Sequence, residues 1–311
     1  MVKKSTKRFL KLDYTTALVV GTGLVLLFSV GIFLAMRYKK KLHEDNDPKR
    51  PLSVLNLPYC NGQKLDLFVP SNDDKPMPLV IYIHGGGWQS GSKVGGSLSL
   101  VKPLVEKNFA VASINYRLSG EAKFPAQIQD VFCAIRFLRQ RAPEYDVNTS
   151  KIGLIGISAG GHLAALAANA SDQPAFTQGA YQETSSRVQA AISMSGVLDL
   201  QDSSLSKYTN TNLDKLLVGT SYNRLTASPS NYLEAGDPSQ LVIYGTKDKT
   251  VAPSQSVNYA ALGSLKGASV ASLAVQNGNH NLQPSFAFTT SPNRSQIIDA
   301  IAAFFQKQLD I

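Results

Sequence analysis

The 311-residue sequence is poor in cysteine, histidine and charged residues, and each shortage excludes a class of protein. Two cysteines are too few for a disulfide-stapled miniprotein. The four histidines are scattered, and there is no C-x-x-C or H-E-x-x-H pattern, so we expect no metal site and no cofactor. A charged fraction of 17% beside a hydrophobic fraction of 43% excludes a disordered chain.

The net charge of +9 is concentrated at the beginning of the chain. Residues 1–50 hold 11 Lys and Arg against 4 Asp and Glu, whereas the other 261 residues hold 20 against 18. A nucleic-acid-binding domain carries its positive charge on its folded surface. We therefore expect no nucleic-acid partner.

An uncharged stretch of 23 residues lies at 14–36. As a helix it would be about 34 Å long, enough to cross a hydrocarbon core of about 30 Å. The alternative is a cleaved signal peptide, but the stretch is long for one and no small-x-small cleavage site follows it. We predict a basic N-terminal tail at 1–13, a single-pass transmembrane helix at 14–36 and a linker at 37–51.

The orientation of this anchor is nearly balanced, because five basic residues precede it and six follow it before residue 51. Translocation of a short, strongly basic tail is unfavourable, which favours an N-terminus inside and the body of the chain on the extracytoplasmic side. Cys60 and Cys133 do not decide the question, because two free thiols can occur in either compartment.

Beyond residue 51, short apolar runs alternate with stretches of helical periodicity. Two strands around Asn61-Gly62 form a predicted hairpin at 54–58 and 64–69. The further predicted strands are 79–83, 110–114, 152–157, 188–194, 241–244 and 269–275. Apolar stripes at 128–138 and 297–305 predict two helices. This order predicts an α/β domain at 52–311 with a mostly parallel central sheet and helices on both faces.

Residues 197–235 interrupt that rhythm with polar clusters and a short helical piece near 213–218. Ligands of open α/β sheets bind beyond the carboxyl ends of the strands, where this insertion would lie. It is either a small lid over the site or a long surface loop.

A serine stands at a sharp turn between a predicted strand and a predicted helix, in the sequence GISAG at 156–160. The glycines let the backbone tighten, so that the Oγ of Ser158 projects from the sheet. A bare G-x-S-x-G is common by chance. In this strand-turn-helix context we interpret Ser158 as a nucleophile rather than a structural serine.

A second glycine-rich turn, HGGGW at 84–88, directly follows the strand 79–83. Its exposed amides could form an oxyanion hole, with the N–H groups of Gly86, Gly87 and Ala159 as donors worth about 3 kcal/mol each in the transition state. A phosphate-binding loop of Walker type is excluded, because Gly91 is followed by Ser92 and not by lysine.

Of the four histidines only one is well placed to act as the base. His43 lies in the linker, His84 in the glycine turn and His162 within the helix after the serine. His280 lies in the polar loop NGNHN, after the last predicted strand.

The orienting acid is Asp248, which follows the strand 241–244, with Asp199 as the competing candidate. The chain order Ser158, Asp248, His280 is the order found in α/β-hydrolases, and it favours Asp248.

Five segments between residues 79 and 280 carry a family resemblance: IYIHGGGW, INYRLSGEAKFPAQIQDV, IGLIGISAGGHLAAL, YGTKDKTV and GNH. In that order they resemble the α/β-hydrolase superfamily, close to its hormone-sensitive-lipase-like and feruloyl-esterase-like (BD-FAE) carboxylesterases. Ile157 stands where the first group usually has Asp, and only a hairpin replaces that group's longer N-terminal cap, which favours the second group.

The resemblance implies an α/β-hydrolase fold, Ser158, Asp248 and His280 as the catalytic triad, and structural roles for Asn115, Tyr116, Arg117 and Asp130. The anchor is not part of the family pattern.

We therefore expect a membrane-anchored serine hydrolase that cleaves small-molecule carboxylic esters of short to medium acyl groups through an acyl-enzyme intermediate. An amidase or formamidase of the same fold, an acyltransferase and a catalytically inactive membrane-tethered binding protein remain alternatives. The sequence does not indicate an oligomeric state.

Overall fold

The computed structural model describes residues 52–71, 76–95, 98–285 and 289–310. The predicted basic tail, membrane-spanning helix and linker at 1–51 lie outside these residues. Within the described ranges, no helix is both long and apolar enough to cross a membrane.

A single sheet of eight strands runs through the described part of the chain in the order β1-β2-β4-β3-β5-β6-β7-β8. The first pairings, β1 with β2 and β2 with β4, are antiparallel, and all others are parallel. The strands are β1 (Leu52–Pro58), β2 (Lys64–Val69), β3 (Met77–Ile83), β4 (Ala110–Ile114), β5 (Val147–Ile157), β6 (Ala190–Met194), β7 (Ser239–Gly245) and β8 (Val270–Val275). The mostly parallel sheet and the antiparallel hairpin at its leading edge are confirmed.

The strands at the centre of this sheet are buried on both faces, which is why they appear as continuous apolar runs. Along β3, side chains point alternately to the two faces. Leu79 and Ile81 belong to the hydrophobic core on one face, whereas Val80 and Tyr82 belong to the core on the other.

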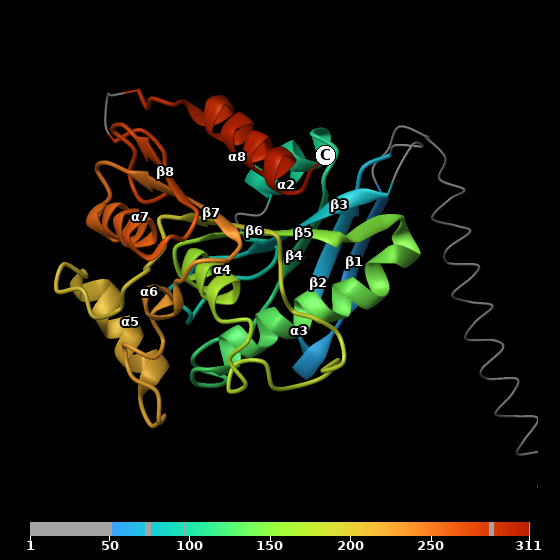
Figure 1. Ribbon diagram of the computed structural model, residues 1–311, viewed down its shortest axis with the longest axis horizontal. Coiled ribbons are helices and arrows are strands. Elements are labelled where there is room, and N and C mark those ends of the chain that lie inside the picture. The colour runs from blue at the N-terminus through green and yellow to red at the C-terminus, as the bar shows by residue number, and fades with distance from the viewer. Residues whose placement is uncertain (1–51, 72–75, 96–97, 286–288, 311) are drawn as a thin grey trace, which may run out of the picture. The chain divides into compact units, whose positions relative to one another are not determined.

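Helices cover both faces of the sheet (Figure 1). One face carries α3 (Ala126–Arg141), α4 (Ala159–Asn169) and α7 (Ser254–Lys266). The other carries α2 (Leu98–Glu106) and α8 (Arg294–Gln308). The predicted apolar stripe of α3 is buried, and in α8 Ile297, Ile301 and Phe305 are buried, so both helix predictions are confirmed.

The insertion at 197–235 contains α5 (Lys207–Leu217) and the short α6 (Pro229–Tyr232). The predicted helical piece at 213–218 was placed too late in the chain, because the helix begins six residues earlier. Ser206 caps it by accepting a hydrogen bond from the Thr209 amide at 3.2 Å. Its buried face contains Thr209 and Asn212 beside Leu213, so hydrophobicity alone did not reveal the first turns.

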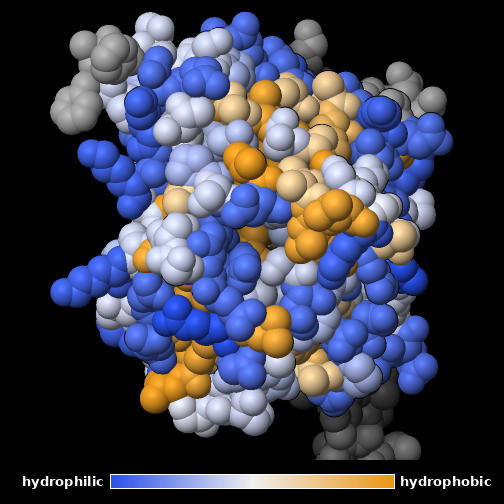
Figure 2. Space-filling view, turned by 60° about the vertical axis from the view of Figure 1, so that its left-hand side comes forward, coloured by the Kyte–Doolittle hydropathy of each residue, from blue (hydrophilic) through white to orange (hydrophobic). Residues whose placement is uncertain are grey.

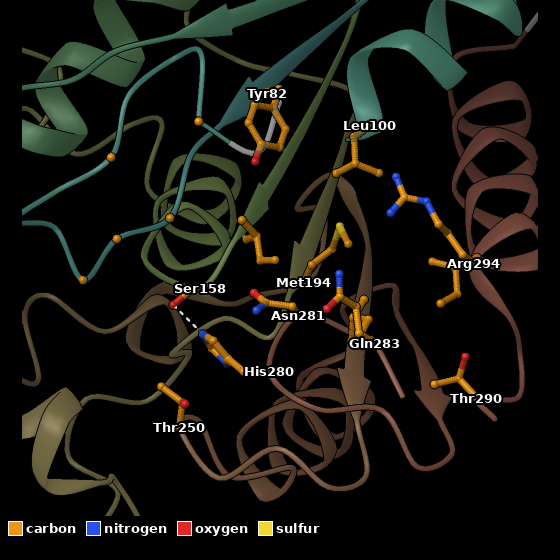
Figure 3. A pocket seen from close by; sticks show the side chains of 18 of the residues that line it. Tyr82, Leu100, Ser158, Met194, Thr250, His280, Asn281, Gln283, Thr290 and Arg294 are labelled. Atoms are coloured by element: carbon orange, nitrogen blue, oxygen red, sulfur yellow. Dashed lines mark hydrogen bonds between the residues drawn. The ribbon is translucent and has the colours of Figure 1, made fainter. Parts of the chain in front are cut away.

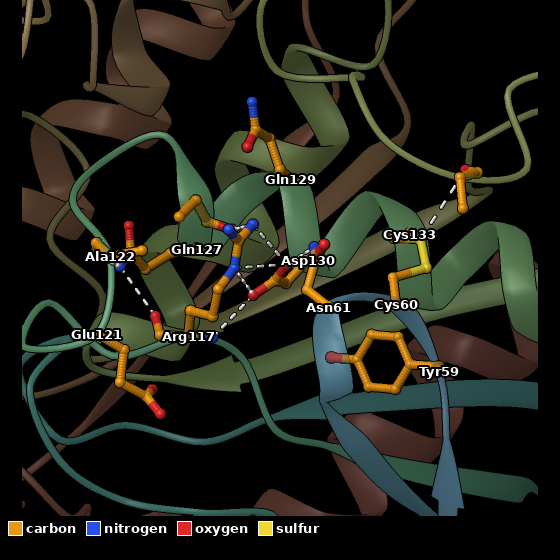
Figure 4. Close-up of polar contacts among 12 residues, drawn as sticks. Tyr59, Cys60, Asn61, Arg117, Glu121, Ala122, Gln127, Gln129, Asp130 and Cys133 are labelled. Carbon is orange, nitrogen blue, oxygen red and sulfur yellow. Dashed lines mark hydrogen bonds and ion pairs between the residues drawn. A yellow bond between two sulfur atoms is a disulfide. The ribbon is translucent and has the colours of Figure 1, made fainter.

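Cys60 and Cys133 form a disulfide that joins the hairpin to α3 across 73 residues of sequence. The carboxylate of Asp130, fully buried on α3, lies nearby and accepts hydrogen bonds from Asn61 Nδ2 at 2.7 Å and from the Arg117 backbone and guanidinium, each at 2.8 Å (Figure 4). The disulfide and the carboxylate together fix the leading hairpin to the helix layer.

Large hydrophobic side chains of the described residues are exposed at several places on the surface. On the side shown in Figure 2 they gather in separate patches within a hydrophilic surface. Tyr208 on α5 and Val257 and Leu265 on α7 are among the large exposed ones.

Candidate active site

Ser158 stands at the junction of β5 and α4 with a backbone φ of 56° and ψ of −119°. A non-glycine residue with positive φ is uncommon, and such strain is concentrated at functional turns. Two residues of this turn must be glycines, because a side chain at either position would collide with the backbone. A Cβ added to Gly156 would lie 2.1 Å from the Gly160 carbonyl oxygen, and one added to Gly160 would lie 2.1 Å from that of Ile83. The turn therefore holds the serine at the end of the strand.

A chain of hydrogen bonds connects Ser158, His280 and Asp248. The Nε2 of His280 lies 3.0 Å from the Ser158 Oγ, and its Nδ1 lies 2.8 Å from Oδ2 of Asp248 (Figure 3 draws the first contact). The three residues follow β5, β8 and β7, whose carboxyl ends meet at one edge of the sheet. This is the geometry of a nucleophile, a base and the acid that orients the base.

The carboxylate of Asp248 is held from both sides. Its Oδ1 accepts hydrogen bonds from the amides of Thr250 at 2.8 Å and Val251 at 3.0 Å, while Oδ2 faces His280. Asp248 is only 7% exposed, so water has little access to this contact. The competing acid, Asp199, instead accepts a hydrogen bond from the Gln201 amide at 2.9 Å.

Neither of the other described histidine side chains forms a hydrogen bond with the Ser158 Oγ. His162 is fully buried, accepts a hydrogen bond from Trp88 Nε1 at 3.2 Å and donates to the Ala227 carbonyl at 2.8 Å, and burial lowers its pKa to about 4. His84 stacks on Tyr116, and burial lowers its pKa as well. His43 lies outside the described residues.

The glycine turn after β3 lines the same cavity as Ser158. The carbonyl of Gly86 accepts hydrogen bonds from the amides of Gln89 at 3.2 Å and Ser90 at 3.1 Å, which closes the turn. The amides of Gly86 and Gly87 donate to no other residue in the described ranges. Ala159 begins α4, where helical amides have no intrahelical acceptor. These are the donors predicted for an oxyanion hole.

The inserted helix α5 is attached to this glycine turn. Gln89 Nε2 donates to Oδ1 of Asn212, and the Lys215 ammonium donates to Gln89 Oε1 at 3.2 Å. Asn212 is 2% exposed, and a Cβ added to Gly87 would lie 2.4 Å from its Nδ2. Lys123 also donates to the Lys215 carbonyl at 2.9 Å. The sequence left open whether the insertion is a lid or a surface loop, and it did not reveal that α5 supports the glycine turn. The residues that make this contact are polar and belong to no motif.

A cavity of about 1070 Å³ opens beside Ser158 and His280. Its walls away from the serine are largely apolar. They include Leu100 from α2, Met194 from β6 and Ile297 from α8. Among the described residues, no cluster of His, Cys, Asp or Glu could hold a metal ion.

Comparison with known proteins gives one family match, in which the BD-FAE family model covers residues 65–262. Esterase LipQ of Mycobacterium tuberculosis is 30% identical over 234 residues, which are 73% of this chain and 54% of that protein. The matched part of the chain spans about half the length of LipQ and of two further relatives from the same organism, LipM and LipC. Kynurenine formamidase of Salmo salar is also 30% identical, over 77% of this chain and 79% of its own.

A solved structure described as a truncated form of carbohydrate esterase from gut microbiota has the same fold, with a TM-score of 0.74 and 29% identity. The similarity covers 86% of this chain and 99% of that one. Because the match covers most of this chain and nearly all of the other, the likeness extends well beyond the motifs.

Proposed function

The chain belongs to the BD-FAE family of α/β-hydrolases, and from this premise we propose that it is a serine hydrolase of carboxylic esters. The observation that carries the proposal is the continuous hydrogen-bonded chain from the Ser158 Oγ through His280 to Asp248, at the wall of an apolar cavity. The named esterases among the relatives support the same reaction class.

In the proposed mechanism, the Ser158 Oγ attacks the ester carbonyl while Nε2 of His280 takes its proton. Asp248 holds the imidazole in the tautomer with Nδ1 protonated and stabilises the imidazolium. The amides of Gly86, Gly87 and Ala159 donate to the oxyanion of the tetrahedral intermediate. The imidazolium then protonates the leaving alcohol, which leaves an acyl-enzyme. Water, deprotonated by His280, attacks that acyl group and releases the acid.

The proposed substrates are esters of short to medium acyl groups. The apolar side chains Leu100, Met194 and Ile297 offer an acyl chain contact without unpaired polar groups. No cofactor takes part in this mechanism.

An N-formyl amidase is the second candidate, because the kynurenine formamidase relative is similar over most of its own length. Its reaction would use the same serine, base and oxyanion donors. Hydrolysis of N-formyl anilides, run beside esters, separates the two.

We further propose that residues 14–36 anchor the chain in a membrane, with the catalytic body on the extracytoplasmic side. The Cys60–Cys133 disulfide supports this orientation, because disulfides persist in oxidising compartments. Membrane fractionation of the full-length chain and protease treatment of intact cells test the two parts separately. A body that is protected from external protease would contradict the orientation.

The testing experiment uses residues 51–311, a compact unit, with p-nitrophenyl esters from acetate to palmitate. We expect hydrolysis that is fastest for short to medium chains and absent in Ser158→Ala. The same variant should lose covalent labelling by a fluorophosphonate. Labelling or turnover that persists in Ser158→Ala would refute the nucleophile. A folded protein that hydrolyses no ester would favour the formamidase, an acyltransferase or an inactive binding protein.

A further inference from the structure

One wall of the cavity beside Ser158 is formed by neighbouring strands of the sheet. Tyr82 on β3, Ile157 at the end of β5 and Met194 at the end of β6 all line it. These side chains point to the same face, because all of them pack in the hydrophobic core that also contains Leu100 of α2. Ile157 directly precedes the nucleophile in the chain. An acyl group that enters the cavity from Ser158 would therefore lie against this wall.

Tyr82 places a polar group in this otherwise apolar wall. Its side chain is 2% exposed, and Figure 3 shows its hydroxyl oxygen on the side of the ring that faces Ser158 and Met194. Burial raises the pKa of Tyr82 to about 12, so the phenol stays protonated at neutral pH and keeps a hydrogen to donate. Apolar pockets use a few placed polar groups of this kind to select and orient their ligands.

The described residues include three other buried tyrosines, and each of them uses its hydroxyl. Those of Tyr59 and Tyr116 donate to backbone carbonyls, and that of Tyr259 donates to a glutamine side chain at 3.0 Å. The Tyr82 hydroxyl has no hydrogen bond with another described residue. A hydroxyl removed from water without a partner costs free energy, whereas phenylalanine would fill the same space without that cost. Packing therefore does not account for this hydroxyl, whereas binding of a ligand atom would.

The position of Tyr82 in the sheet indicates where that ligand atom would lie. Tyr82 is paired with Ile155, three residues before Ser158. At about 3.3 Å per residue, the two positions are about 10 Å apart along the strand. The hydroxyl would therefore meet the acyl group several carbons from the scissile carbonyl. An anion in this apolar wall would lose its hydration for a single hydrogen bond, so an uncharged acceptor fits the place better.

We propose that the Tyr82 hydroxyl donates a hydrogen bond to the bound acyl group, and that the preferred ester carries an uncharged acceptor oxygen, such as that of a ketone, several carbons from the scissile carbonyl. This inference rests on the proposed ester hydrolysis and specifies the acyl part of its substrate. The rest of the acyl group is apolar, because it lies along Ile157 and Met194.

Four matched substrate pairs test this contact on the full-length chain in an uncharged detergent. The p-nitrophenyl esters of 4-oxopentanoate, 5-oxohexanoate, 6-oxoheptanoate and 7-oxooctanoate place the ketone at successive distances from the scissile carbonyl. Each is compared with the ester of the acid in which a methyl group replaces the keto oxygen, for example 4-methylpentanoate. The measured quantity is the ratio of kcat/KM for the keto ester to that for its methyl partner.

We expect the ratio in at least one pair to fall about tenfold in Tyr82→Phe, which removes the hydroxyl and keeps the ring. The intrinsic reactivity of the two esters cancels when the ratio is compared between variants. The change should appear mainly in KM, since the ketone is bound alike in the ground and transition states.

Tyr116→Phe is the matched control. It also removes a buried hydroxyl, but this one already donates to the His84 carbonyl at 3.1 Å, and Tyr116 does not line the cavity. All four ratios should therefore remain those of the wild type. Equal ratios in Tyr82→Phe and the wild type for every pair, or an equal fall in Tyr116→Phe, would overturn the inference.

Failure of the inference and failure of the proposed function give different results. Hydrolysis that depends on Ser158 but shows no effect of Tyr82→Phe on any ratio refutes the hydroxyl contact alone. If no ester is hydrolysed, calorimetric binding of the same esters to Ser158→Ala, with and without Tyr82→Phe, still decides the contact. We expect one keto ester to bind about tenfold more tightly than its methyl partner only where Tyr82 is present, and equal preferences in the two proteins would refute the contact.

Discussion

The Cys60–Cys133 disulfide provides the prediction with the most definite magnitude. It closes a loop of 73 residues, for which the chain-entropy model gives about 4.4 kcal/mol of stabilisation at 25 °C. We expect the double variant Cys60→Ala/Cys133→Ala to lose most of this amount from its free energy of unfolding. The loss is a large part of the stability of an ordinary domain.

The hydrogen bonds around the disulfide determine how the loss should appear. Asn61 still donates to Asp130, and Tyr59 still donates to the Asn115 carbonyl, so the hairpin stays attached to the folded body. Neither cysteine lines the cavity beside Ser158. The variant should therefore unfold at a lower urea concentration, while its kcat for a p-nitrophenyl ester should remain that of the wild type.

The sole tryptophan supplies the assay. Trp88 is 1% exposed and packs edge-on against His162, so its fluorescence should change when the core opens. Urea unfolding of residues 51–311 is compared for the wild type with and without a reductant and for the double variant. Reductant should destabilise the wild type and leave the double variant unaffected. A double variant as stable as a wild type whose disulfide is verified by mass spectrometry would refute the reasoning.

Three other predictions concern the site and its support. Asp248→Asn should lower kcat by roughly 10⁴-fold, because the base loses its orienting carboxylate, whereas a comparable loss in Asp199→Asn would show that the acid is misassigned. Asn212→Ala should lower kcat roughly tenfold or more, since the glycine turn loses a buried contact. Asn210→Ala, on the same helix but bonded to the Leu205 carbonyl, is its control and should keep the kcat of the wild type. Burial lowers the pKa of His162 from 6.5 to about 4 in the folded protein. As the pH falls below about 6.5, the unfolded chain therefore binds a proton at this histidine before the folded protein does. The free energy of unfolding should decrease accordingly, by about 2 kcal/mol at pH 5. His162→Gln should show a smaller fall in the urea midpoint between pH 7.5 and 5, and an unchanged fall would contradict this assignment.

Much of the fold could be predicted because burial on both faces leaves a clear mark on the sequence. The strands β3, β4 and β6 are buried throughout and almost entirely apolar, and α3 shows its buried stripe at helical spacing. Where burial decreases, the prediction was incomplete. Four of the first five residues of β5, VNTSK, are polar and at least partly exposed, and the predicted strand omitted all five.

The site divides in the same way. Ser158, Asp248 and His280 could be selected because each follows a recognisable strand, and parallel strands bring their carboxyl ends to one edge. The contact of Gln89 with Asn212 and the pairing of Cys60 with Cys133 join residues that are 123 and 73 positions apart. No periodicity or motif reports such contacts, since they depend on how the finished layers meet.

The attachment of α5 to the glycine turn has a consequence for the physical form of the substrate. Lipases that must displace a cover show a jump in rate when their substrate forms droplets or micelles. Here the Gln89–Asn212 contact leaves α5 beside the catalytic residues, and the His280 side chain remains 21% exposed to water. The enzyme should therefore follow simple saturation with dissolved ester and show no jump at the critical micelle concentration. The proposed anchor would then hold the hydrolase at a bilayer, while its substrates are dissolved esters and not the lipids of that bilayer.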